Sequence, residues 1–258
     1  LRCLYVQKEA EGRLVSMLKG AMDELAIGDP WPLSTDVGPV IDAQAREGIA
    51  AHVETARAEG RLLHECRLPA QAAASGHFLA PTLIQVTGIA DIEREVFGPV
   101  LHVATFEADE LDATIDAINA RGYGLTFGLH TRIDGRVQHV AERVRAGNLY
   151  VNRNQIGAIV GSQPFGGEGL SGTGPKAGGP RYLARFRALP APPAEAEAPA
   201  PGGPLEAPAL AARLARATGA GATLEAQSLP GPTGESNRLV RVARAPLLCL
   251  GPGAGAAG

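Results

Sequence analysis

Two stretches of the sequence combine residue types that can bind a small ligand. The first is Glu95-Val96-Phe97-Gly98-Pro99, where a carboxylate stands two positions before an aromatic ring and a Gly-Pro pair follows. A carboxylate can accept hydrogen bonds from ligand hydroxyls while the ring packs on a planar group. The same spacing also suits a capped turn with a phenylalanine in the core, so both interpretations stay open.

The second stretch is the glycine-rich segment from Gly157 to Gly179. Glycine adopts backbone angles closed to other residues and lets a ligand approach the main chain, so we expect an ordered loop that binds a ligand. Successive amides at Gly157 and Ala158 could form a small anion-binding nest, and Phe165 could line the pocket. A purely structural crossover remains the alternative.

Cysteine and histidine residues suggest no further chemistry. Cys3, Cys66 and Cys249 have no basic partner indicated by the sequence, and a buried cysteine behaves as a small hydrophobic residue. The six histidines lack metal-binding spacing, so we expect no metal site. The GxGxxG-like fragment 167–172 is a weak signal for a dinucleotide fold, because it does not follow a strand and open a helix.

Composition limits the class of protein. The net charge of −3 over 258 residues implies no broad basic face for nucleic acid, and no apolar run reaches the roughly 20 residues of a membrane span. An odd number of cysteines argues against a secreted disulfide framework, so we expect a cytoplasmic protein. Because the first seven residues resemble a buried strand, we expect the sequence to begin inside a larger protein.

The elements that would position these residues alternate between strands and helices, which predicts an α/β fold with a mostly parallel sheet and flanking helices. Asp42 should cap a helix that reaches Glu59, and Pro81 marks its strand as bent or at a sheet edge. Expected strands cover 1–7, 61–66, 77–86, 95–106, 123–131 and 148–152. Expected helices cover 8–27, 42–59, 109–120 and 134–147, with a helical turn at 91–94; inward-facing residues are Leu14, Met17, Leu18, Met22, Leu25, Ile49, Val53, Ala56, Leu111, Ile115 and Ile118.

The composition changes after Leu189. Residues 190–204 are rich in proline and lack large apolar side chains, so we expect a disordered linker. Residues 205–258 should form an incomplete C-terminal tail module with a short alanine-rich helix and one or two strands near 238–251. Residues 1–189 then form the main domain.

The motifs in their order resemble the C-terminal half of the aldehyde dehydrogenase superfamily, over roughly Leu1 to Leu189. They are Glu95–Pro99, Gly147–Asn152, Pro164–Gly167 and Ser171-Gly172. Residues 157–167 and 169–180 are most similar to L-glutamate γ-semialdehyde (Δ1-pyrroline-5-carboxylate) dehydrogenases, above all those at the C-terminus of bifunctional proline utilization A flavoproteins. Residues 229–235 resemble the region that follows the dehydrogenase domain there. The resemblance implies the catalytic-domain half of the aldehyde dehydrogenase fold, truncated at its N-terminus.

The resemblance also implies a mechanism and site residues. In the family a cysteine thiolate attacks the aldehyde, hydride passes to NAD+, and water activated by a glutamate hydrolyses the thioester. By this resemblance Glu95 would hold the nicotinamide ribose hydroxyls and Phe97 would pack beside the nicotinamide. Gly157 and Ala158 would donate backbone N–H groups to the substrate's α-carboxylate, and Phe165 would pack on its aliphatic chain.

The nucleophilic cysteine and the general-base glutamate are expected upstream of Leu1, so this chain alone should be inactive. FAD would belong only to a proline dehydrogenase domain outside this chain. The implied partners are the small-molecule semialdehyde and further copies in a homo-oligomer, with transient membrane association of the parent protein only. Two alternatives stay open: oxidation of another aldehyde such as succinic semialdehyde, and a non-catalytic assembly domain that oligomerises through a strand near Tyr182 to Arg187.

Overall fold

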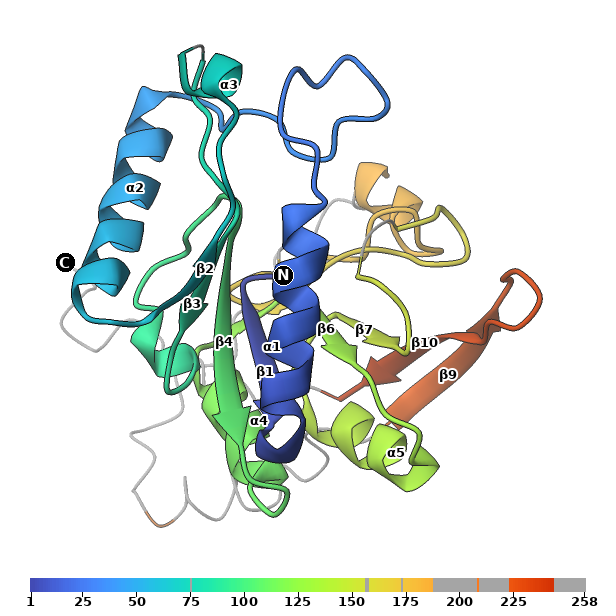
Figure 1. The fold of residues 1–258 in the computed structure, drawn as a ribbon. Coiled ribbons are helices and arrows are strands. Elements are labelled where there is room, and N and C mark those ends of the chain that lie inside the picture. Colours follow the sequence, from blue (N-terminus) through green and yellow to red (C-terminus); the bar gives the residue numbers. More distant parts are fainter. Residues whose placement is uncertain (75, 156–157, 173, 188–207, 209–222, 244–258) are drawn as a thin grey trace, which may run out of the picture. The chain divides into compact units, whose positions relative to one another are not determined.

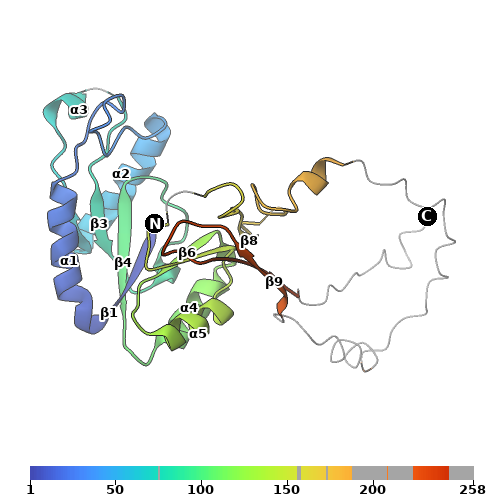
Figure 2. The same ribbon diagram turned by 90° about the vertical axis from the view of Figure 1, so that its right-hand side faces the viewer.

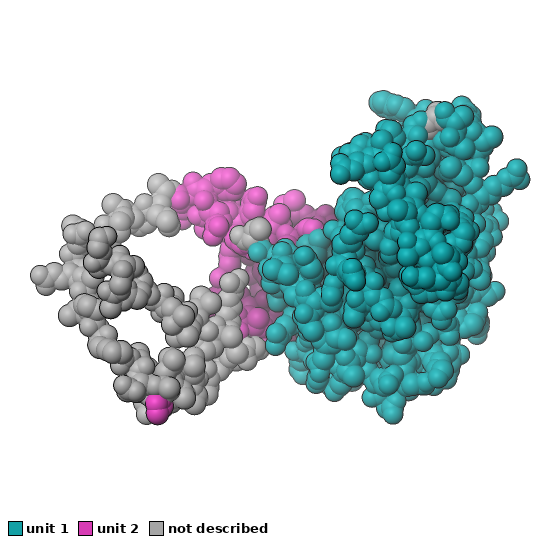
Figure 3. Space-filling view, turned by 90° about the vertical axis from the view of Figure 1, so that its left-hand side faces the viewer, with its two compact units in different colours: residues 1–155, 167–172 teal, residues 156–166, 173–258 magenta. Residues whose placement is uncertain are grey.

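The computed structural model describes residues 1–74, 76–155, 158–172, 174–187, 208 and 223–243. They belong to two compact units, coloured in Figure 3: unit 1 is Leu1–Gln155 with Gly167–Gly172, and unit 2 is Ile156–Gly166 with Thr173–Gly258. The expected linker, the tail helix and Cys249 lie outside the described residues, and the domain boundaries stay predictions. Among the described residues, none of the helices combines the length and the apolar character needed to cross a membrane.

Unit 1 is built on a four-stranded sheet in the order β1-β4-β3-β2 (Figure 1). Strands β1 (Cys3–Gln7), β4 (Val100–Phe106) and β3 (Thr82–Gln85) run parallel, and β2 (Leu62–Glu65) pairs antiparallel with β3. The predicted α/β fold with a mostly parallel sheet is confirmed.

Pro81 predicted a strand that is bent or at a sheet edge, and the edge position is wrong. Strand β3 lies inside the sheet, and Pro81 stands immediately before its first residue. The Pro81 carbonyl still accepts a hydrogen bond from the Cys66 amide at 3.0 Å. At this position the missing N–H of proline removes no hydrogen bond from the strand itself.

Two helices cover the opposite faces of this sheet, α1 (Lys8–Asp23) and α2 (Ala43–Ala58), and Figure 2 shows α1 on one side of β3 and β4. Neighbouring strand residues alternate between the faces, so one set packs under each helix. The set that includes α2 is Ile49, Val53, Ala56, Ile84, Val86, Val96, Val100 and Ala104. The other is Val6, Leu83 and Val103, with Leu14, Val15 and Met22 of α1 packed against it.

Helix α2 agrees with the sequence-based prediction, and helix α1 departs from it. The Asp42 carboxylate accepts a hydrogen bond from the Ala45 amide at 2.7 Å, and Ile49, Val53 and Ala56 are buried, as predicted. In contrast, α1 ends at Asp23 rather than near Gly28, and Met17 is 63% exposed. The prediction for Met17 is wrong because α1 packs on the sheet along a narrower stripe than its apolar residues suggest.

The second half of unit 1 holds shorter elements. After α3 (Ala70–Ala74) and the 3-10 turn η1 (Ile89–Asp91) come α4 (Leu111–Ala120), β5 (Tyr123–Gly124), β6 (Thr126–Leu129), α5 (Asp134–Arg143), β7 (Asn148–Val151) and β8 (Glu168–Gly169). The strand predicted over 123–131 is divided, because β5 pairs with β8 and β6 pairs in parallel with β7. The helical turn expected at 91–94 lies earlier, at η1.

Unit 2 contains an antiparallel hairpin of β9 (Thr223–Leu229) and β10 (Asn237–Val242). The sequence analysis predicted a strand near β10 but none at β9. The strand expected near Tyr182 to Arg187 is wrong: this stretch forms the 3-10 turn η2 (Leu183–Phe186), in which the Tyr182 and Phe186 rings meet edge to face at 5.6 Å.

Candidate active site

The segment before β4 presents two of the predicted site residues at the surface of unit 1. Val96 is 5% exposed and packs in the core under α2, so the side chains on either side of it point outward. Phe97 is 73% exposed, and the Glu95 side chain is 63% exposed. The alternative of a phenylalanine in the core is therefore wrong.

Gly98 lets this segment lie directly against α2. A Cβ atom at Gly98 would come within 2.5 Å of Cδ1 of Ile49, whose side chain is buried. Real Cβ atoms essentially never approach another heavy atom so closely. The Gly-Pro pair thus fixes the course of the backbone immediately after Phe97.

Arg2 joins Glu95 to Phe97. Its Nε atom lies 3.2 Å from Oε1 of Glu95, and its guanidinium carbon lies 4.5 Å from the centroid of the Phe97 ring. Such a contact combines an ion pair with a cation–π interaction and restricts the side-chain rotation of both partners. The sequence analysis missed Arg2, because 93 positions separate it from Glu95 and no local pattern connects them.

A buried histidine holds the backbone of Arg2. The Arg2 carbonyl accepts hydrogen bonds from the His102 amide at 3.1 Å and from His102 Nδ1 at 2.9 Å. Because Nδ1 carries the proton, Nε2 of His102 is left to accept a hydrogen bond from His52 Nε2, 2.8 Å away. Burial lowers the pKa of both imidazoles, and the neighbouring Arg61 lowers them further. The hydrogen bond between the two Nε2 atoms requires His102 to be neutral, and the lowered pKa of each ring favours its neutral form.

The cysteines that the structure describes are unsuited to nucleophilic attack. Burial, with a smaller effect of Asp91, raises the pKa of Cys3 to about 12. Burial, Asp23 and Glu65 raise the pKa of Cys66. A thiol must ionise to become a nucleophile, so neither position favours catalysis.

The part of the glycine-rich loop that lies in unit 2 is ordered over its described residues. Phe165 and Ala177 exchange two backbone hydrogen bonds of 3.0 and 2.8 Å, and the Gly161 amide donates to the Gly178 carbonyl at 2.9 Å. Gly161 and Gly178 have φ angles of 84° and 69°, which favour glycine. The expectation of an ordered loop is confirmed for these residues.

The predicted substrate-binding residues belong to this loop. Ala158 is exposed, Phe165 is half-buried, and Gly157 lies outside the described residues. The structure brings Glu95 and Phe97 together, through Arg2, within unit 1. Ala158 and Phe165 belong to unit 2.

The fragment 167–172 supports no separate nucleotide site. It forms the two-residue strand β8 and a turn, in which the Ser171 hydroxyl accepts a hydrogen bond from the Gly124 amide at 3.2 Å. Its glycines allow close backbone approach: a Cβ atom at Gly169 would lie 2.4 Å from the Gly122 carbonyl oxygen. These glycines serve packing, as the weak match to GxGxxG suggested.

Comparisons with known proteins show which proteins this chain resembles. The bifunctional protein PutA of Klebsiella aerogenes is 43% identical over 97% of this chain and 21% of its own length. The 1-pyrroline-5-carboxylate dehydrogenase 1 of Halalkalibacterium halodurans is 37% identical over 69% of this chain and 34% of its own length. A crystal structure of a Bradyrhizobium japonicum proline utilization A (PutA) mutant matches 72% of this chain and 19% of that chain, with 49% identity and a TM-score of 0.68.

The chain therefore spans only about a fifth to a third of the relatives that it matches. The similarity to the Klebsiella aerogenes protein extends beyond residue 189, since it covers 97% of the chain. The model of the aldehyde dehydrogenase family matches residues 1–189. This chain belongs to the aldehyde dehydrogenase family.

Proposed function

We propose that this chain is the C-terminal part of an NAD-dependent L-glutamate γ-semialdehyde dehydrogenase within a bifunctional proline-catabolic protein. The observation that carries the proposal is the similarity of the same chain to PutA proteins and to separate 1-pyrroline-5-carboxylate dehydrogenases. The separate enzymes suggest the substrate, whose semialdehyde form is oxidised to L-glutamate. The PutA proteins suggest the bifunctional context, in which FAD belongs to a proline dehydrogenase domain outside this chain.

The surface around Glu95 and Phe97 fits a dinucleotide. The exposed carboxylate of Glu95 can accept hydrogen bonds from ribose hydroxyls, and the exposed ring of Phe97 offers a flat apolar face. Arg2 holds these two side chains in a limited range of rotamers, which lowers the entropy lost when they bind a ligand. When bound, NAD+ supplies the hydride acceptor of the reaction.

The glycine-rich loop is proposed to anchor the substrate. The backbone N–H groups of Gly157 and Ala158 would donate hydrogen bonds to its α-carboxylate, and Phe165 would pack on its aliphatic chain. The backbone hydrogen bonds of Phe165 with Ala177 support a loop of fixed shape. A fixed anchor orients the reacting aldehyde and so lowers the entropic part of the barrier.

We place the nucleophilic cysteine and the general-base glutamate in protein sequence preceding Leu1, so that none of the catalytic residues lies in this chain. The high pKa of Cys3 supports this assignment, because a thiol of that kind stays protonated at neutral pH. Homo-oligomeric assembly and a cytoplasmic location are further parts of the proposal.

The substrate anchor is tested by Ala158→Pro in the full-length protein, because proline lacks the N–H that would donate to the α-carboxylate. A hydrogen bond to a charged group is worth about 1.5–3 kcal/mol, so we expect KM for the semialdehyde to rise roughly 10- to 100-fold. KM for an aldehyde without the α-carboxylate should not change. The matched control Ala158→Ser keeps the amide and should behave like the wild type; equal KM values for Ala158→Pro and the wild type would refute the anchor.

Two observations test the alternatives, which are oxidation of another aldehyde and a non-catalytic assembly domain. Comparing kcat/KM for glutamate semialdehyde with that for succinic semialdehyde decides the substrate. A non-catalytic assembly domain would require a parent protein without the upstream cysteine. The turn η2 in place of a strand at Leu183–Phe186 removes the strand on which that alternative was based.

A further inference from the structure

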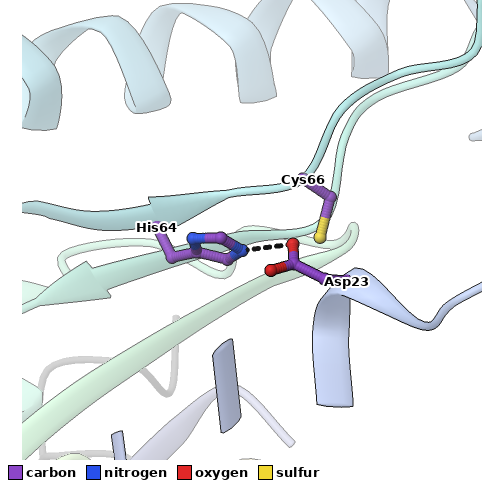
Figure 4. Close-up of side chains that lie close together, drawn as sticks. All are labelled: Asp23, His64 and Cys66. Carbon is purple, nitrogen blue, oxygen red and sulfur yellow. Dashed lines mark hydrogen bonds and ion pairs between the residues drawn. The ribbon is translucent and has the colours of Figure 1, made fainter. Parts of the chain in front are cut away.

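Three side chains with different metal-binding atoms meet where α1 ends beside β2. Asp23 is the last residue of α1, His64 lies in β2, and Cys66 follows that strand. Their ligand atoms, a carboxylate oxygen, a ring nitrogen and Sγ, all lie within 4.8 Å of one another (Figure 4). None of the three residues belongs to the motifs that the proposed function uses.

The local structure of β2 brings these atoms together. The pairing of β2 with β3 shifts register between Leu62 and His64, and such an irregularity redirects the side chains that follow it. His64 Nε2 lies 2.7 Å from Oδ1 of Asp23, and the Cys66 thiol donates to the Met22 carbonyl at 3.3 Å. His64 and Cys66 thus both contact the last turn of α1.

We propose that Asp23, His64 and Cys66 form a binding site for a divalent cation of the zinc class. Sulfur, imidazole nitrogen and carboxylate oxygen are the donors that Zn²⁺ takes, and three protein ligands leave a fourth tetrahedral position for water. The sequence analysis expected no metal site, because the ligands come from separate elements and show no metal-binding spacing.

The ligand atoms of these three side chains need to move only a short way to bind the cation. Zn–ligand distances of about 2.0–2.3 Å in a tetrahedron place neighbouring donor atoms roughly 3.4–3.6 Å apart. The oxygen and nitrogen at 2.7 Å must separate by somewhat less than an ångström, and no pair of ligand atoms is more than 4.8 Å apart. The Asp23 side chain is 55% exposed, so its carboxylate is free to move by this amount.

Charge and proton balance favour binding. The cation displaces the Cys66 thiol proton, which is released to solvent as the Zn–S bond forms. The proton between Nε2 of His64 and the Asp23 carboxylate moves through solvent to Nδ1 of His64. Nε2 can then donate its lone pair to the cation. One thiolate and one carboxylate then neutralise the divalent charge. The carbonyl end of α1 also favours a cation. The ion would clamp the end of α1 to β2.

The test is a titration of the intact protein that carries this chain with Co²⁺, followed by displacement with Zn²⁺. We expect a thiolate-to-cobalt charge-transfer band in the near ultraviolet and the visible bands of tetrahedral Co²⁺, both lost when Zn²⁺ is added. Cys66→Ser should remove the charge-transfer contribution of this site. Cys3→Ser, which changes the other described cysteine, should keep it.

A second variant distinguishes loss of the metal site from misfolding of the protein. Asp23→Asn alters an exposed side chain and should leave the circular dichroism spectrum unchanged. It should weaken Co²⁺ binding by more than about 10-fold, the lower end of the effects seen even for outer-shell residues. A wild-type protein without the charge-transfer band, or a band of equal intensity in Cys66→Ser, would overturn the proposal and leave a hydrogen-bonded cluster only.

Discussion

The contact between Gly98 and Ile49 links the core under α2 to the segment that carries Glu95 and Phe97. A methyl group added by Gly98→Ala would lie 2.5 Å from Cδ1 of Ile49, but 3.5 Å from Cγ1 and 3.8 Å from Cγ2. The clash therefore involves one atom, and Ile49→Val removes that atom. Overpacking of this kind costs about 1–3 kcal/mol, and Ile→Val in a core costs about 0.5–1.5 kcal/mol.

The double variant should be more stable than the sum of the single effects predicts. The new methyl group would fill the space left by Cδ1, so we expect a coupling free energy of about 1–3 kcal/mol in favour of Gly98→Ala/Ile49→Val. Urea unfolding of the wild type, both single variants and the double variant measures it. The affinity for NAD+ should fall in Gly98→Ala and recover in the double variant. Additive effects on stability would refute the assigned contact.

The other predictions concern Arg2, the histidine pair, Cys3 and the activity of this chain alone. Arg2→Ala should raise the Kd for NAD+ about 5-fold, since an exposed ion pair with a cation–π contact contributes roughly 1 kcal/mol. Arg13→Ala, at an exposed position of α1, should not change this Kd. Because the pKa values of His52 and His102 are lowered from 6.5 in the folded state, stability should be full above pH 6.5 and fall as the pH drops through the lowered values. His52→Gln, which keeps a donor for the partner ring, should reduce this fall in urea unfolding measured at several pH values, and an unchanged fall would contradict the pairing. Cys3→Ser should leave turnover of the full-length protein within about 2-fold, because the partly buried Cys3 thiol, with its pKa raised to about 12, stays protonated and is not the nucleophile. This chain alone should not oxidise the semialdehyde with NAD+.

The sequence predicted those features that depend on neighbouring residues. The cap at Asp42 and the buried faces of Ile49 and Ile115 follow from helical spacing and from hydrogen bonds within one turn. The strand order could not be read in this way, since pairing depends on contacts between distant segments. Pro81 illustrates the difference: its ring predicted a strand that is bent or at a sheet edge, whereas its position just before β3 allows a central strand.

The candidate site was predictable only in part for the same reason. The motif around Glu95 marked the segment, and the apolar Val96 between two larger side chains explains why they point outward. Arg2 gave no signal, because its role comes from spatial contact across 93 positions. His64 and Cys66 gave none either, because a register shift in β2 turns them toward the end of α1.

The parallel pairing of β1 with β4 explains why Arg2 reaches Glu95 and Phe97. Cys3 pairs with His102, so the residues that precede both strands lie at the same edge of the sheet. Open α/β sheets usually bind ligands at the carboxyl ends of their strands, but here the exposed Glu95 and Phe97 lie at the amino ends. If the nucleophilic thiol that we place before Leu1 stood only a few residues before β1, it would enter on this edge, beside the surface proposed for the nicotinamide. The register of two strands would then set the distance between nucleophile and cofactor. Buried His102, which holds the Arg2 carbonyl and is itself hydrogen-bonded to His52, would stabilise that register.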